Sequence, residues 1–206
     1  MKIIAHRAND CIHEENSLEA ILNSLEKEYV DGIEIDIRLT KDNKLIICHD
    51  PFYRGHFIKY TKIKKLEKLG LNSLNEVLTK IKTDKIIMLE IKIEDKKHQK
   101  LANILNKTLK KYSLNFYLCS FNYDLMKLIK EKYYSYKCGL IIGFQMNKDK
   151  INNNLNFNSL SLSYAEKNFN KETFIWTVND IKNLKINKRY NIITDKPLKI
   201  SNELKK

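Results

Sequence analysis

Short apolar segments alternate with amphipathic stretches along most of the chain. Strands are predicted where β-branched apolar residues cluster, at 3–5, 32–38, 44–48, 86–93, 115–119, 137–142, 159–162, 173–178 and 191–194. Helices are predicted where apolar residues recur every three or four positions, at 17–27, 74–81, 101–109 and 124–132, with a shorter one at 181–186. This alternation of strand and helix favours a parallel sheet covered by helices.

About eight strand candidates in roughly 200 residues predict a small (β/α)8 TIM barrel, with an open doubly wound sheet as the alternative. No linker rich in Pro, Gly or Ser interrupts the chain, so residues 1–206 are expected to form a single domain. The pattern is weak across 145–158, which predicts thin outer helices in the C-terminal half. Pro51 and Pro197 each follow a strand candidate and are expected in loops.

The segment 32–38 places two carboxylates on one face of a strand. Alternate residues of a strand point the same way, so Glu34 and Asp36 share a face opposite three isoleucines. If the isoleucines pack against helices, the carboxylates lie inside the barrel. The alternative is an edge strand with a solvated acidic face.

A similar pattern recurs at the end of the segment 86–93, where Glu90 and Lys92 share a face. Glu90 adds a third inward carboxylate to Glu34 and Asp36. Three oxygen ligands without a cysteine pair or histidine cluster favour a hard cation, Mg²⁺ or Ca²⁺, over zinc. The alternative is an internal ion pair between Glu90 and Lys92.

Two histidines, His6 and His49, each follow an apolar strand candidate. In an α/β barrel the carboxyl ends of the strands form the active face, so the pair is a candidate general acid and base. Arg7 offers a planar fork suited to a phosphate. The other histidines lie in loop or surface contexts: His13, His56 and His98.

The net charge of +13 does not by itself indicate a nucleic-acid-binding protein. Basic residues number 38, yet Arg occurs only at positions 7, 38, 54 and 189. Readers of nucleic acid depend on the bidentate contacts of Arg, and Lys occurs in every part of the chain. We expect a solvated basic surface with no specific nucleic-acid partner and only weak attraction to anionic surfaces.

The cysteines also exclude several classes of protein. Cys11, Cys48, Cys119 and Cys138 form no C-x-x-C pair, so neither a zinc site nor a disulfide scaffold is expected. They are predicted to be reduced, mostly buried thiols. No stretch reaches 18 apolar residues, and the N-terminal segment lacks the apolar core of a signal peptide, so a cytoplasmic location is expected.

The order and spacing of several motifs resemble the glycerophosphodiester phosphodiesterase family, within the phospholipase-C-like phosphodiesterases. The most specific of them lie in the first fifty residues: His6-Arg7, Glu15-Asn16-Ser17-Leu18-Glu19-Ala20, Gly32 to Asp42, and His49-Asp50-Pro51. The similarity continues through Arg54, Ser73 to Leu78, Leu89 to Lys92, Ser120 to Asn122, Trp176 to Asn179, and Ile193 to Pro197.

This resemblance implies an enzyme of lipid metabolism that hydrolyses small glycerophosphodiesters to glycerol 3-phosphate and an alcohol. By position, it implies a metal site at Glu34, Asp36 and Glu90, an acid/base pair at His6 and His49, phosphate ligands at Arg7 and Lys92, and a pocket wall at Trp176. Glu15 would either approach the metal or orient Arg7. The attacking group is either water or a hydroxyl of the substrate, which would give a cyclic phosphate first.

The chain departs from the family pattern in two places. Ala8 stands where the family usually has Gly, which matters only if that backbone needs a positive φ. The segment 52–72 is shorter than the usual insertion after the second strand. The identity of the alcohol in the substrate is therefore left undetermined. Two alternatives follow: an enzyme acting on lysophospholipid or sphingomyelin-type headgroups through a short cover with Phe52, Tyr53 and Phe57, or a non-enzymatic basic binding module.

Overall fold

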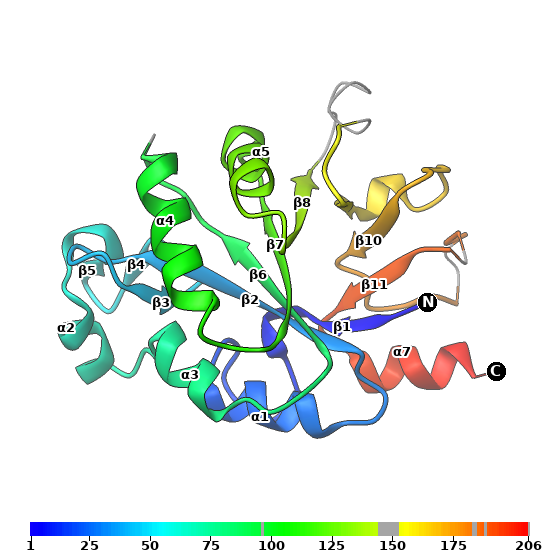
Figure 1. The fold of residues 1–206 in the computed structure, drawn as a ribbon. Coiled ribbons are helices and arrows are strands. Elements are labelled where there is room, and N and C mark those ends of the chain that lie inside the picture. The colour runs from blue at the N-terminus through cyan, green and yellow to red at the C-terminus, as the bar shows by residue number, and fades with distance from the viewer. Residues whose placement is uncertain (96, 144–152, 183–184, 188, 206) are drawn as a thin grey trace.

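Eight parallel strands close into a barrel in this computed structural model (Figure 1), which describes all residues except 96, 144–152, 183–184, 188 and 206. Around the barrel the strands are β1 (Ile3–Ala5), β2 (Gly32–Leu39), β6 (Ile86–Ile91), β7 (Asn115–Ser120), β8 (Lys137–Ile142), β9 (Phe157–Ser161), β10 (Glu172–Trp176) and β11 (Asn191–Thr194). Because β1 pairs with both β2 and β11, the sheet has no open edge there. The predicted barrel is confirmed, and the open sheet is excluded.

Helices cover the outside of the barrel. Four lie where they were predicted: α1 (Leu18–Glu26), α3 (Leu74–Lys80), α4 (His98–Leu109) and α5 (Tyr123–Lys132). Two were not predicted: α2 (Ile63–Lys68) and α7 (Pro197–Leu204). The loop expected at Pro197 is wrong, because this proline opens α7 at its first turn, where a missing N–H costs nothing.

The outer layer thins after β8. Only the 3₁₀ helix η3 (Leu162–Tyr164) joins β9 to β10 within the described residues. The helix predicted at 181–186 is wrong for the part of it that is described, which has no helical turn. Most of the weak segment 145–158 lies outside the described residues. Among the described residues between β9 and β11, the predicted thin outer layer is therefore confirmed.

One predicted strand has a different role. The segment 44–48 forms β3 (Leu45–Ile47), which runs antiparallel to the end of β2, with Ile37 opposite Ile47. It is not a barrel strand. This hairpin returns the chain to the carboxyl end of the barrel, where Cys48 N donates to Asp36 O (3.0 Å). A smaller hairpin, β4 (Phe52–Tyr53) and β5 (His56–Phe57), follows, then the 3₁₀ helix η2 (Ile58–Tyr60) and α2.

Two apolar layers hold the barrel together. Between sheet and helices, the isoleucines of β2 at positions 33, 35 and 37 are fully buried. Inside the barrel, the rings of Tyr117, Phe157 and Phe174 pack with centroids 5.3–5.9 Å apart. Since Tyr117 pairs with Met88, one step before Glu90 on the same face, these rings fill the barrel below the carboxylates. Open space remains at the carboxyl end.

Within the described residues, the helices are all too short or too polar to cross a bilayer.

Candidate active site

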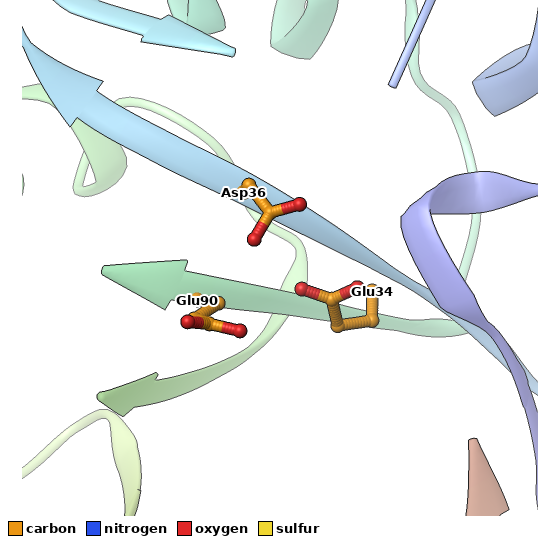
Figure 2. Close-up of side chains that lie close together, drawn as sticks. All are labelled: Glu34, Asp36 and Glu90. Carbon is orange, nitrogen blue, oxygen red and sulfur yellow. The ribbon is translucent and has the colours of Figure 1, made fainter. Parts of the chain in front are cut away.

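Three carboxylates meet inside the barrel at its carboxyl end (Figure 2). Glu34 and Asp36 come from β2, and Glu90 comes from β6 directly opposite Asp36. One oxygen of each lies within 4.8 Å of the others. Glu34 and Asp36 are only 4% and 1% exposed, which confirms the interior face and excludes the solvated edge strand.

The carboxylate cluster has an excess of negative charge. Burial, followed by the charges of Asp36 and Glu90, raises the pKa of Glu34 well above its usual value. Glu34 Oε2 accepts a bond from Arg7 N (3.0 Å), but the buried Oε1 has no hydrogen-bond partner among the described residues. A buried acceptor without a partner is unfavourable. The three carboxylates therefore fit a hard divalent cation, which such oxygen ligands prefer.

Lys92 lies beside the cluster. Its Nζ is 3.0 Å from Asp36 Oδ1 and also contacts Glu90 Oε1. Burial alone lowers the pKa of Lys92, but the charges of Asp36 and Glu90 outweigh it and raise that pKa. The internal ion pair with Glu90 is thus present. Lys92 also lines the adjoining cavity, so its charge faces both the cluster and any anion held there.

Arg7 approaches the cluster from the short 3₁₀ helix η1 (His6–Ala8), which directly follows β1. Its Nη1 donates to Glu15 Oε2 (3.2 Å), and its Nε lies 3.7 Å from Asp36 Oδ2. Of the two roles considered for Glu15, the structure has it contacting Arg7 and not joining the cluster. Asn16, whose side chain exchanges two hydrogen bonds with Asp36, fixes that carboxylate further.

The backbone beside Arg7 adopts a left-handed conformation. Arg7 has φ 51° and Ala8 has φ 53°. The position where the family usually has Gly therefore does require a positive φ. Ala8 meets that requirement at the cost of local strain, and its methyl group is fully buried.

His6 is held by a chain of hydrogen bonds. Its Nδ1 lies 2.6 Å from Asp195 Oδ1, and Asn179 Nδ2 donates to Asp195 Oδ2 (2.7 Å). The bond with His6 is the largest cause of the lowered pKa of Asp195. His6 Nε2 is left facing Glu34, 4.0 Å from Oε2. Asp195 and Asn179 were not predicted as site residues, although each is a polar residue just past a barrel strand.

His49 reaches the site by a different route from the one predicted. It follows β3, the returning arm of the hairpin, and not a barrel strand. Its backbone oxygen accepts from Arg38 Nε (3.0 Å) and Nη2 (2.6 Å), while its Nδ1 lies 2.7 Å from Asp50 Oδ1. Arg38, which also pairs with Glu94, was not predicted to support the site.

A cavity of about 200 Å³ opens between these side chains. Every predicted site residue except Asp36 lines it: His6, Arg7, Glu34, His49, Glu90, Lys92 and Trp176. Its apolar lining includes Met88, Cys119, Ile141 and Ile193. Trp176 is half-buried, packs edge-on against Phe121 at 6.2 Å, and has no hydrogen-bond partner for Nε1 among the described residues.

Apart from Cys119, the cysteines lie outside this cavity, as do His13, His56 and His98. All four cysteines are free thiols; Cys11 is exposed and Cys48, Cys119 and Cys138 are buried, as predicted. Cys119 alone lines the cavity. His13 makes one close contact outside the cavity, because its Nδ1 lies 2.5 Å from the carboxylate of Asp10.

The closed barrel, the buried carboxylates and the two histidines together define a class of (β/α)8 barrel protein with one charged cavity, and three carboxylates that fit a cation, at the carboxyl end of the strands. Comparison of the sequence with known families narrows this class. The pattern of the glycerophosphoryl diester phosphodiesterase family matches residues 6–168, and the chain belongs to this family of hydrolases.

Two relatives align with about two thirds of the chain. An uncharacterized protein from Mycoplasma genitalium is 30% identical over 161 residues, 68% of each chain. A glycerophosphodiester phosphodiesterase from Caldanaerobacter subterraneus is 29% identical over 160 residues, covering 68% of this chain and 65% of its own length.

Solved structures share the fold over the full chain. A glycerophosphodiester phosphodiesterase from Parabacteroides distasonis superposes with TM-score 0.84 at 21% identity, covering 100% of this chain and 98% of that one. A phosphodiesterase from Oleispira antarctica, in complex with the product sn-glycerol-3-phosphate, gives 0.83 at 18% identity, covering 100% and 97%. These likenesses support the fold.

Proposed function

We propose that the protein hydrolyses glycerophosphodiesters to glycerol 3-phosphate and an alcohol, using Mg²⁺ or Ca²⁺ held by Glu34, Asp36 and Glu90. The observation that supports this most is the meeting of three buried carboxylates and two histidines around one cavity of about 200 Å³. Family membership and the glycerol 3-phosphate bound to the Oleispira relative support the same substrate class.

Several positive charges around the cavity would bind the phosphate together. When bound, the cation neutralises phosphate charge and stabilises the more highly charged transition state. Arg7 and Lys92 add two further positive charges, and both are fixed in advance by Glu15, Asp36 and Glu90. Because these donors are already oriented, little reorganisation accompanies the reaction.

The two histidines carry out the proton transfers of the reaction. Asp195 keeps the Nδ1 side of His6 occupied, which leaves Nε2 to take or give a proton at the cavity. Asp50 stands in the same relation to His49 Nδ1. One histidine removes the proton of the attacking oxygen, and the other protonates the departing alcohol. Attack by water or by a substrate hydroxyl uses the same two transfers.

One observation favours a lipid-headgroup substrate as the second candidate. A further hollow of about 300 Å³ runs from Arg7 and His49 to Phe52 and Tyr53 at the β4–β5 hairpin. An acyl chain attached to the glycerol would leave the cavity along this side. Release of headgroup from a lysophospholipid would distinguish this candidate.

The test is a substrate panel with purified protein and Mg²⁺ or Ca²⁺: glycerophosphocholine, glycerophosphoethanolamine, glycerophosphoglycerol and lysophosphatidylcholine. We expect glycerol 3-phosphate from at least one soluble diester and none from the double variant His6→Ala/His49→Ala. Failure to release an alcohol from any of these substrates would overturn the proposal. Turnover of the lysolipid alone would favour the second candidate.

A further inference from the structure

The β4–β5 hairpin presents a row of exposed aromatic rings. Phe52 and Phe57 are directly paired across the hairpin, so they lie on one face, with ring centroids 5.1 Å apart. Tyr60 packs edge-on against Phe57 at 6.4 Å. The three residues are 47%, 56% and 68% exposed. Large rings gathered on a surface are unusual unless that surface meets an apolar or interfacial partner.

These rings are not needed to complete a core. Beneath the hairpin lies a separate apolar cluster in which Ile46, Ile58 and Leu66 are fully buried. The hairpin turns tightly at Arg54 and Gly55, both with positive φ. The aromatic row is therefore held outward by a folded support.

The segment that carries the aromatic row is rich in positive charge. Residues 51–72 contain six cations and one acid, Glu67, which gives 6 − 1 = +5 in 22 of the 206 residues. The cations are Arg54, Lys59, Lys62, Lys64, Lys65 and Lys68. In the part of the chain that the structure describes, none of these six forms an ion pair. This charge is free to meet an anionic surface.

A basic hollow continues this surface toward α4. It measures about 220 Å³ and is lined by Lys41, Lys59, Tyr60, Lys97 and Lys100, among others. Two acids also line it, but Glu94 pairs with Arg38, and Asp95 lies 3.9 Å from Lys97. The rings and the hollow share Tyr60, so apolar and cationic groups lie side by side.

We propose that Phe52, Phe57 and Tyr60, together with the lysines of their segment and of the adjoining basic hollow, dock the protein on an anionic phospholipid bilayer. Aromatic side chains favour the headgroup region of a bilayer, and lysines bind its anionic lipids. A nucleic acid fits less well, because the rings pack edge to face and the carboxylate cluster would repel a polyanion. The hairpin follows His49 directly, so docking brings the cavity close to the membrane. Only the catalytic use of this position, with the cavity near lipid substrates, rests on the proposed function.

Vesicle sedimentation tests the docking without substrate. Purified protein is mixed with vesicles of phosphatidylcholine alone or with about 30% phosphatidylglycerol, at about 50 and 200 mM salt. We expect binding only with phosphatidylglycerol, weakened by salt. Phe57→Ser/Tyr60→Ser should lower the partition coefficient at least tenfold. Lys59→Gln and Lys62→Gln should each lower it about fivefold, the fold-change for about 1 kcal/mol per lysine.

Matched controls lie elsewhere on the surface. Tyr134→Ser removes a ring that is 89% exposed beyond α5, and Lys205→Gln removes an exposed charge at the end of α7. Both should bind vesicles like the parent, and melting curves should show all variants folded. Parent-like binding by the Phe57/Tyr60 variant, equal binding to neutral vesicles, or a dimer abolished by that variant would overturn the proposal. Vesicle binding without diesterase activity would overturn only the proposed function.

Discussion

At the scale of single residues, Asp195 decides which nitrogen of His6 faces the carboxylate cluster. We predict that Asp195→Asn lowers kcat about 10- to 100-fold with little change in KM, because the imidazole loses its orientation and charge partner. The pH–rate profile should also change on the limb that reports His6. Steady-state kinetics across pH test this.

Asp124→Asn, in the exposed first turn of α5, is the matched control and should behave like the parent. A Glu at position 195 should restore part of the lost activity. An unchanged pH profile in Asp195→Asn would mean that Asp195 has a structural role only.

The second prediction concerns the two histidines of the cavity. His6→Ala and His49→Ala should each lower kcat about 10²- to 10⁴-fold, the usual loss for a general acid or base. Both side chains are partly exposed at the open end of the barrel, so folding should survive. His98→Ala at the start of α4 is the control. Near-parent turnover by either cavity variant would show that the histidine concerned transfers no proton.

The sequence predicts the carboxylates better than it predicts their neighbours. Strand alternation puts Glu34 and Asp36 on one face of their strand and Glu90 on one face of another, and closure of the barrel makes both faces interior. Asp195 meets His6 across 189 residues, a contact that exists only once β11 pairs with β1. Arg38 supports His49 through a backbone oxygen, which leaves no residue pattern to recognise.

At the scale of elements, β8 depends on a glycine facing the barrel interior. A Cβ at Gly139 would lie 2.2–2.5 Å from the ring of Phe157. We predict that Gly139→Ala destabilises the fold by about 1–3 kcal/mol through overpacking. Urea unfolding measures this. Gly143→Ala is the control, because its Cβ would come no nearer than 4.0 Å to Phe121; equal stability of the two variants would contradict the prediction.

In the loop between η1 (His6–Ala8) and α1, the carboxylate of Asp10 makes four hydrogen bonds. Burial tends to raise the pKa of Asp10, but hydrogen bonds from His13, Asn23 and Ile12 outweigh it and lower that pKa below its usual value of 3.8. A lowered folded-state pKa stabilises the protein above the unfolded value. This stability is lost as the pH falls through the folded value.

We therefore predict that Asp10→Asn melts below the parent at pH 7 and that the difference shrinks as the pH falls below about 4. Thermal melts from pH 7 to pH 2 test this, with Asp124→Asn as control. A constant difference across the range would show that Asp10 acts through packing and not through its charge.

The elements that the sequence missed have specific physical reasons. The strand β3 has the apolar content of a barrel strand, but its direction depends on the turn at 40–43, where Asn43 has φ 59°. Pro197 follows a strand, which suggests a loop, yet it equally suits the first turn of a helix. At 181–186 a helical spacing occurs, yet the described residues of that segment form no helix, so periodicity over so few residues is not decisive.

At the scale of the whole molecule, the closed barrel follows from the number and spacing of the strand segments. The distribution of charge over the folded surface does not follow from these segments. Lys occurs throughout the sequence, yet 51–72 carries a net +5 of the total +13, and folding places it beside the basic hollow near α4. Lys is thus present throughout the chain, but 51–72 has only one acidic residue, Glu67, to balance its six cations.

The most direct measurement is hydrolysis of glycerophosphocholine by protein stripped of metal, with and without added cation. We predict that excess EDTA abolishes release of glycerol 3-phosphate, that Mg²⁺ or Ca²⁺ restores it, and that the same cation raises the melting temperature. Glu90→Gln should need a higher cation concentration for both effects. Full activity in excess EDTA, with no bound metal found by elemental analysis, would contradict a cation at Glu34, Asp36 and Glu90.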